Sequence, residues 1–187
     1  MITDPHFFGY GSLVNRATHS YAQAHPARAQ GWRRTWRHTA GRDVAILTAV
    51  PAPGVQIDGL IAAVPGGDWA VLDEREVDYD RLLAGDSVLH ETGLSPAVSI
   101  YSIPETKHPA APAPRPVLLS YLDVVVQGYL REFGEDGARR FFDTTDGWGG
   151  IRDDRAAPLY PRAQRLSTAE TAFVDGELHR MGLNALP

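Results

Sequence analysis

The strongest constraint on the fold lies near the start of the chain, where an apolar run leads into a turn that holds two glycines, Phe7-Phe8-Gly9-Tyr10-Gly11-Ser12-Leu13. Glycine adopts backbone conformations closed to other residues and lets a ligand approach the main chain closely. Successive N–H groups in such a turn can converge on an anion. Similar turns also serve as simple tight connections after a buried strand. The stretch therefore predicts a strand that ends in a loop, with Tyr10, Gly11, Ser12 and Leu13 as candidates for ligand binding.

Two well-known glycine loops are excluded by the neighbouring residues. A dinucleotide-binding fingerprint requires a third glycine where this chain has Val14, and an acidic residue at the end of a second strand about 20 positions further on, which is absent. A serine-hydrolase elbow requires glycine two residues to either side of the serine, but Ser12 has Tyr10 and Val14 at those positions. The loop is therefore not expected to bind a dinucleotide or to present a serine nucleophile.

Composition is that of an ordinary globular protein. With 187 residues, 43% of them hydrophobic and 22% charged, the chain is long enough to bury a core of its own, and we predict a single domain over residues 1–187. The net charge of -5 argues against binding to nucleic acid or to an anionic membrane surface, because both require clustered positive charge. Small-molecule or protein partners are expected instead, and the oligomeric state stays open.

Residue usage also limits the chemistry and the location that we expect. The chain has no cysteine, which excludes disulfides, thiolate metal sites and cysteine nucleophiles. Its seven histidines are scattered without metal-ligand spacing, so we predict no metal and no cofactor. The first residues lack the basic and apolar regions of a secretion signal, and no run approaches the ~18 apolar residues of a membrane span. A cytoplasmic location is expected.

Short β-rich runs separated by proline and glycine predict a sheet. The alternation in Gln30–Arg37 predicts a strand with one basic and one aromatic face, which explains its arginines and tryptophans without an RNA partner. Pro51–Gly54 is expected to form a turn, and the remaining β-rich runs are Val44–Val50, Val55–Val64 and Ser95–Ile103. This pattern is typical of an antiparallel or mixed sheet, here expected to curl into a small barrel.

A helix is predicted from Asp68, a good N-cap, to about Tyr79. Four apolar or aromatic residues share its inner face: Trp69, Leu72, Tyr79 and Leu83. At ~100° per residue, Glu76 lies about 40° from Leu72 on that face, whereas Glu74 lies about 160° away. A glutamate in an acidic helix is most often solvated. A carboxylate on an apolar face must find a partner or raise its pKa, and a raised pKa is what acid–base catalysis uses.

A long amphipathic helix dominates the second half of the chain. Pro104–Pro116 is proline-rich and is expected to be an extended surface connection. Val117–Phe133 then carries one apolar stripe, and Gly134 is placed to end the helix. Tyr121 lies on the stripe, either as a plain core residue or with its hydroxyl in a pocket.

The C-terminal part is expected to be less regular. A short helix is predicted over residues 135–142 and a turn-rich loop over residues 144–150. Ile151–Arg165 shows no regular pattern and forms either a lid or a surface strap. Ser167-Thr168-Ala169-Glu170 is a capping box that begins a last helix, which Gly182 should close.

The order and spacing of Phe8-Gly9-Tyr10-Gly11-Ser12-Leu13 and Leu72-Asp73-Glu74-Arg75-Glu76 resemble the γ-glutamylcyclotransferase-like superfamily, with its AIG2-like and ChaC branches. Further similar stretches are Gly31-Trp32-Arg33-Arg34, Val50-Pro51-Ala52-Pro53-Gly54 with Gly59-Leu60, and Ser120-Tyr121 to Gly128. The resemblance covers about residues 7–130 and leaves residues 131–187 as a C-terminal extension. Leu13 stands where one branch has asparagine, and Val77-Asp78 replaces a glycine that often follows the catalytic glutamate.

The resemblance implies a mixed α/β fold, with a small mixed or antiparallel β-barrel flanked by helices, and an enzyme that cyclises a γ-glutamyl group to 5-oxoproline without a cofactor. It implies Glu76 as the catalytic acid and base. Tyr10, Gly11, Ser12 and Leu13 would bind the substrate, with Tyr121 as a further candidate. The leaving group stays open between glutathione, γ-glutamyl amino acids and γ-glutamyl amines. A non-catalytic ligand-binding module and a γ-glutamyl amidase that uses water are the alternatives.

Overall fold

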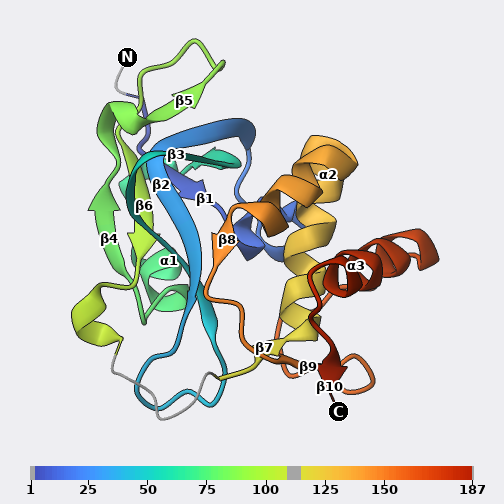
Figure 1. Ribbon diagram of the computed structural model, residues 1–187. Coiled ribbons are helices and arrows are strands. Elements are labelled where there is room, and N and C mark those ends of the chain that lie inside the picture. Colours follow the sequence, from blue (N-terminus) through green and yellow to red (C-terminus); the bar gives the residue numbers. More distant parts are fainter. Residues whose placement is uncertain (1–2, 109–114, 187) are drawn as a thin grey trace.

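Seven strands form one mixed sheet in the computed structural model, which describes residues 3–108 and 115–186 (Figure 1). The order along the sheet is β4-β6-β1-β3-β2-β5, and β8 pairs with β2. Pairing is antiparallel except for β1 with β6 and β2 with β8. The bounds are β1 His6–Gly9, β2 His25–Arg37, β3 Ile46–Ala63, β4 Asp80–Leu83, β5 Val88–His90, β6 Val98–Ser102 and β8 Thr145–Asp146.

Helices and a second small sheet complete the fold. The α-helices are α1 Ala70–Arg75, α2 Leu119–Asp143 and α3 Thr168–Arg180. The second sheet has three parallel strands in the order β10-β9-β7: β7 Val117–Leu118, β9 Ile151–Arg152 and β10 Ala185–Leu186. Short 3-10 helices cover Ser12–Val14, Arg16–Thr18, Pro65–Gly67, Gly85–Ser87 and Glu105–Lys107. No helix in the described part is long and apolar enough to cross a membrane.

The sheet is open. In the described residues the edge strands β4 and β5, of four and three residues, pair with β6 and β2 and not with each other. A barrel requires an unbroken hydrogen-bonded circuit around all strands, which this order lacks. The predicted mixed α/β class with helices beside a mixed sheet is confirmed, and its closure into a barrel is corrected to an open sheet.

The predicted turn at Pro51–Gly54 is wrong, because the chain does not reverse there. Pro51 pairs with Trp32 and Gln56 pairs with Gln30, so residues 52–55 bulge out of one long strand, β3. The glycine at 54 supplies a positive φ of 81° within this bulge. Both β-rich runs of the sequence therefore belong to the same strand, antiparallel to β2.

Strand β2 alternates as expected, with one exception. Trp32 and Trp36 are buried, and Arg33 and Arg37 lie on the other face. Arg34, however, is 1% exposed and shares the tryptophan face. A strict separation into basic and aromatic faces was therefore wrong, because period-2 geometry places residues 32, 34 and 36 together whatever their charge.

Helix α2 crosses the core beside the N-terminal loop. A Cβ on Gly128 would lie 2.7 Å from the Asn15 nitrogen, so glycine lets the helix and the loop touch. Gly134, with φ 66° and ψ -173°, interrupts the helix where the sequence predicted its end, and helical residues resume after it. The buried core is continuous across this break, since it contains Phe141 and also Val174 of α3.

Two other helix predictions have different outcomes. Ser167 and Glu170 form the capping box at the start of α3, as predicted, and Gly182 follows the helix with φ 70°. Helix α1 is shorter than predicted and ends at Arg75, so Leu83 falls in β4 with 80% of its surface exposed. The proline-rich connection contains a short 3-10 helix at Glu105–Lys107, and its residues 109–114 lie outside the described part.

Candidate active site

The N-terminal loop leaves strand β1 at Gly9 and enters the short 3-10 helix Ser12–Val14. A Cβ on Gly9 would lie 2.6 Å from Leu13 Cβ, and one on Gly11 would lie 2.7 Å from the Tyr121 hydroxyl. Neither glycine has a positive φ. The glycines are therefore required by the close approach of neighbouring groups and not, as the sequence predicted, by special backbone conformations.

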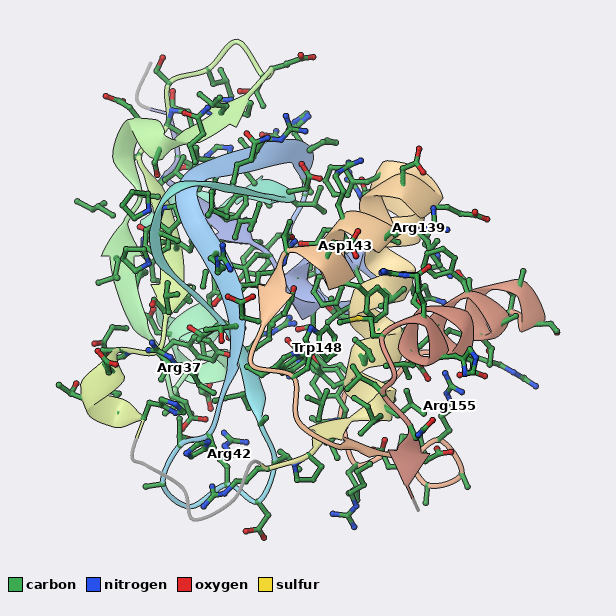
Figure 2. All side chains as sticks on the ribbon, in the orientation of Figure 1. Arg37, Arg42, Arg139, Asp143, Trp148 and Arg155 are labelled. Atoms are coloured by element: carbon green, nitrogen blue, oxygen red, sulfur yellow. The ribbon has the colours of Figure 1, made fainter. Side chains whose placement is uncertain are left out.

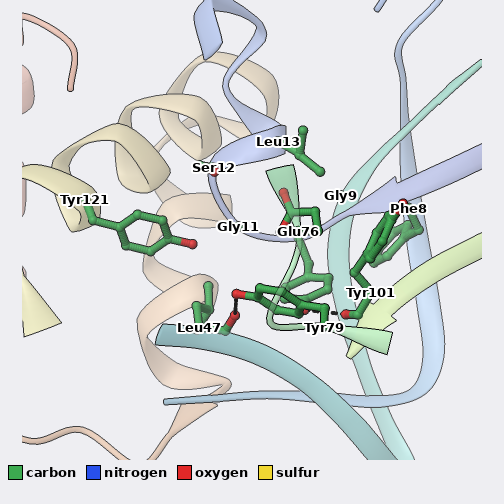
Figure 3. Close-up of a pocket in the computed structure, with 11 residues that line it drawn as sticks. Phe8, Gly9, Gly11, Ser12, Leu13, Leu47, Glu76, Tyr79, Tyr101 and Tyr121 are labelled. Atoms are coloured by element: carbon green, nitrogen blue, oxygen red, sulfur yellow. Dashed lines mark hydrogen bonds between the residues drawn. The ribbon is translucent and has the colours of Figure 1, made fainter. Parts of the chain in front are cut away.

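One narrow pocket brings together all six residues singled out from the sequence. Tyr10, Gly11, Ser12 and Leu13 of the loop face Glu76 from the end of α1 and Tyr121 from α2 (Figure 3). Five further residues line the same pocket: Phe8, Gly9, Leu47, Tyr79 and Tyr101. The cavity volume is about 30 Å³, room for only one or two water-sized groups, so the pocket holds only a small part of any ligand.

Glu76 is positioned by the end of helix α1. Its backbone N–H donates to the Leu72 carbonyl at 3.0 Å, which closes the last turn. Its side chain is 14% exposed, whereas Glu74 is exposed, so the predicted difference between the two faces is confirmed. Arg75 lies beside it, with Nε 3.2 Å from a carboxylate oxygen.

Electrostatics around Glu76 favour its protonated form. Burial raises the pKa of the Glu76 carboxyl above its ordinary value, although the positive charges of Arg75 and Arg162 act in the opposite direction. Arg75 divides its donors, since it also donates to the Thr18 carbonyl at 2.9 Å and to Ser12 Oγ at 3.1 Å. Arg75 therefore holds the Glu76 carboxyl group in place without cancelling the rise in its pKa that burial causes.

Tyrosine side chains line the pocket that holds the carboxylate. Tyr79 donates to the Leu47 carbonyl at 2.7 Å, and Tyr10 donates to the Tyr101 carbonyl at 2.5 Å. The Tyr121 hydroxyl lies against Gly11 at the pocket wall. Burial raises the pKa of Tyr10, Tyr79 and Tyr121. These phenols therefore stay protonated near neutral pH and act as hydrogen-bond donors.

Three of the additional lining residues were not predicted from the sequence as site residues. Tyr79 follows Glu76 by three residues and was placed on its face, but was not proposed for the site. Leu47 comes from β3 and Tyr101 from β6, and both reach the pocket through the strand order. Nothing in their local sequence marks them, because the pairing of β1 with both β3 and β6 is what brings them to the loop.

A larger chamber of about 430 Å³ adjoins the pocket. Four residues line both spaces, namely Ser12, Glu76, Tyr79 and Tyr121. Residues of the irregular segment 153–167, including Tyr160 and Arg162, line the outer chamber. Within residues 3–108 and 115–186, no three histidine or acidic side chains group as metal ligands would.

Several solved structures share the fold of this chain. A structure named γ-glutamyl cyclotransferase matches with a TM-score of 0.59 at 16% identity, over 92% of this chain and 98% of its own. An uncharacterized protein from Homo sapiens matches with a TM-score of 0.58 at 16% identity, over 91% of this chain and 97% of its own. YkqA from Bacillus subtilis matches with a TM-score of 0.54 at 19% identity, over 76% of this chain and 56% of its own. No protein-family model and no curated protein sequence matches the chain.

The chain therefore has the fold of the γ-glutamylcyclotransferase-like superfamily, and the resemblance drawn from its motifs is confirmed at the level of the fold. Because a fold can host several activities, the function is argued from the site.

Proposed function

We propose that the protein is a γ-glutamylcyclotransferase, which converts a γ-glutamyl group to 5-oxoproline and releases an amine or an amino acid. One observation carries this proposal: a nearly buried carboxylate, Glu76, shares a single narrow pocket with a glycine loop and four tyrosines, one of which belongs to the loop. The fold shared with a structure named γ-glutamyl cyclotransferase supports the same activity.

The reaction needs proton transfer more than it needs an enzyme nucleophile. The α-amine of the γ-glutamyl group attacks its own γ-carbonyl, a C–N bond forms, and the bond to the leaving nitrogen breaks. Holding the two groups in a near-attack geometry supplies on the order of 7–11 kcal/mol of the barrier. Glu76 takes the proton from the substrate ammonium and then gives it to the leaving nitrogen. A carboxyl group whose pKa is raised by burial suits both transfers.

Charge on the carbonyl oxygen must be stabilised as the amine adds. In the described part of the chain no group accepts a hydrogen bond from the Gly11 N–H, and the neutral Tyr121 hydroxyl lies beside it. Fixed donors of this kind are worth most in a site shielded from water. The inner pocket has room for little more than the reacting carbonyl, so the rest of the substrate extends into the outer chamber.

Mass-spectrometric product analysis on a panel of γ-glutamyl amino acids, peptides and amines tests the proposal. The expected product is 5-oxoproline together with the free amine or amino acid. Release of glutamate instead would indicate an amidase that uses water. Binding of γ-glutamyl compounds without any product would indicate a non-catalytic ligand-binding module.

A further inference from the structure

The outer chamber adjoins the narrow pocket at Glu76. Glu76 and Tyr121 line both spaces, so a substrate whose scissile bond lies at Glu76 places its leaving group in the chamber. Part of its wall comes from residues 159–162, which lie in the stretch Ile151–Arg165 that the sequence left as either a lid or a surface strap. Tyr160 of this segment packs edge to face on Tyr121 with 4.9 Å between ring centroids. The wall therefore reaches the site directly.

Both ends of this segment are tied to helix α2. The Asp154 carboxylate accepts hydrogen bonds from the N–H and the hydroxyl of Ser120, at 2.8 and 2.5 Å. Arg155, labelled in Figure 2, forms ion pairs with Asp123 at 2.7 Å and, on α3, with Asp175 at 2.7 Å. At the other end Gln127 donates to the Arg165 carbonyl at 3.2 Å. The segment is therefore a strap held in place, and its side chains are fixed features of the chamber.

The chamber combines apolar walls with cations. Ile46, Leu118 and Leu159 supply apolar surface. Arg42, at the hairpin end of β2 and β3, is already paired with Asp78 at 2.5 Å (Figure 2).

Two other arginines of the chamber, Arg152 and Arg162, differ from Arg42. Among the described residues, neither Arg152 nor Arg162 has a carboxylate within ion-pair distance. Arg162 is half-buried and close enough to Glu76 to oppose the rise in the pKa of that carboxyl. Arg152 is exposed. A guanidinium that is partly buried without a partner suits a carboxylate, which it binds through two parallel hydrogen bonds.

We propose that the outer chamber is a leaving-group site that selects an amino acid with an apolar side chain and a free α-carboxylate, and that Arg162 binds this carboxylate. The inference rests on the proposed cyclotransferase function and narrows its substrates to γ-glutamyl dipeptides of apolar amino acids. γ-Glutamyl amines, which lack the carboxylate, are poor substrates on this view.

Three substrates with the same apolar side chain test the inference: γ-glutamyl-leucine, γ-glutamyl-leucinamide and γ-glutamyl-3-methylbutylamine. The first has the carboxylate, the second replaces it by a neutral amide, and the third lacks it. In the unmodified protein kcat/KM should be about 10- to 100-fold higher for the first than for the other two, the usual effect of a hydrogen bond to a charged group. In Arg162→Gln this preference should fall to less than about 3-fold, within the scatter of such contributions.

The ratio between substrates is the decisive measurement. Loss of Arg162 also removes a positive charge near Glu76, but that change affects all three substrates alike and cancels in the ratio. Arg162→Lys keeps the charge and should retain part of the preference. Arg165→Gln, on the same strap but outside the chamber and exposed, should keep all of it.

Several outcomes would overturn the inference. Equal turnover of the three substrates by the unmodified protein would do so while leaving the cyclotransferase function intact. An equal loss for all three in Arg162→Gln would mean that Arg162 binds the glutamyl end of the substrate instead. A preference that survives Arg162→Gln but not Arg152→Gln would move the role to Arg152. No 5-oxoproline from these compounds or from a wider panel would remove the cyclotransferase function itself, and the inference with it.

Discussion

Two buried ionisable groups of this protein, Arg34 and Glu76, have opposite surroundings. Arg34 is 1% exposed and donates to four neutral oxygens, namely the Tyr129 hydroxyl at 2.7 Å, the Asp58 carbonyl at 3.0 Å, Thr145 Oγ1 at 3.2 Å and Thr144 Oγ1 at 2.6 Å. Its guanidinium also lies over the rings of Tyr129 and Phe141, at 5.2 and 5.0 Å from their centroids. Among the described residues Glu76 has one charged neighbour within ion-pair distance, Arg75, and otherwise faces a cavity.

The difference separates a structural charge from a chemically available one. Burial shifts the pKa of both groups toward the neutral form, down for Arg34 and up for Glu76. Around Arg34 four of the five guanidinium N–H donors bond to protein oxygens, so the charge joins β2, α2 and β8 and has little left to offer a ligand. The oxygens of Glu76 remain open to a substrate. Burial of a charge marks a functional site only where its hydrogen bonds are left incomplete.

The largest effect is expected from Glu76→Gln, which keeps the size of the side chain and removes its exchangeable proton. The value of kcat for 5-oxoproline formation should fall about 10²- to 10⁴-fold, the usual contribution of a general acid–base group. Substrate affinity should change little, because the amide still fits the pocket. Steady-state kinetics on purified variants measure both quantities.

Glu74→Gln is the matched control for this experiment. Glu74 lies two residues away in the same short helix and is exposed, so its loss should leave kcat nearly unchanged. A strong loss of turnover in Glu74→Gln with little effect in Glu76→Gln would contradict the assignment of the proton transfer to Glu76.

Arg34→Ala should act on stability instead. The substitution deletes four hydrogen bonds and two ring contacts and leaves a cavity beside Tyr129 and Phe141. We expect the free energy of unfolding in urea to fall by about 3 kcal/mol. Arg33→Ala, on the exposed face of the same strand, should cost less than about 1 kcal/mol, since its ion pair with Asp146 is at the surface. Equal losses in the two variants would remove the structural role assigned to Arg34.

The contrast between these two groups could be predicted only in part from the sequence. Helical spacing placed Glu76 inward and Glu74 outward, because a period of 3.6 depends on neighbouring residues alone. The fate of Arg34 depends on Tyr129, Thr144 and Thr145, which are about a hundred residues away in the chain. The predicted division into a basic and an aromatic face did not place Arg34 with the tryptophans, and no local signal shows that the far segment supplies its acceptors.

Other parts of the fold also divide into features set by neighbouring residues, which could be predicted, and features set by distant contacts, which could not. The break at Gly134 and the capping box at Ser167 are local and were predicted correctly. The bulge after Pro51 was predicted as a turn. Proline and glycine indicate that regular strand pairing is interrupted, but they do not show whether the chain reverses or continues in the same strand. The strap residues that line the outer chamber had no periodic pattern, since their positions are set by contacts of Asp154 and Arg155 with α2 and α3.

A smaller effect on activity is expected from Tyr121→Phe. The ring packs against Trp36 and Tyr160 and should stay in place, so the substitution removes only the hydroxyl beside Gly11. We expect kcat/KM to fall about 10-fold, as for a single neutral hydrogen bond made to the reacting carbonyl. An unchanged kcat/KM would make Tyr121 a core residue whose hydroxyl does not contact the substrate.

The smallest expected effect is a difference in thermal stability between the unmodified protein and Glu76→Gln that depends on pH. The pKa of Glu76 is raised in the folded protein above its ordinary value of 4.5. Below the ordinary value the carboxyl is neutral whether the chain is folded or not, and its burial costs nothing. As pH rises through the folded-state pKa, the folded protein must hold a buried charge and loses stability relative to Glu76→Gln. The Gln variant should therefore have the higher Tm at about pH 8, and the two melting temperatures should converge near about pH 4.

Thermal melts of the two proteins across this pH range provide the measurement, and the difference between them isolates Glu76 from the other carboxylates. If the Gln variant melts lower at every pH, the ion pair with Arg75 outweighs the burial of the charge. Glu76 would then be paired as completely as Arg34 is hydrogen-bonded, and the distinction between an available and a structural charge would no longer hold for this site. A higher Tm together with the loss of turnover would mean that the protein gives up stability to keep a charged carboxylate in the pocket.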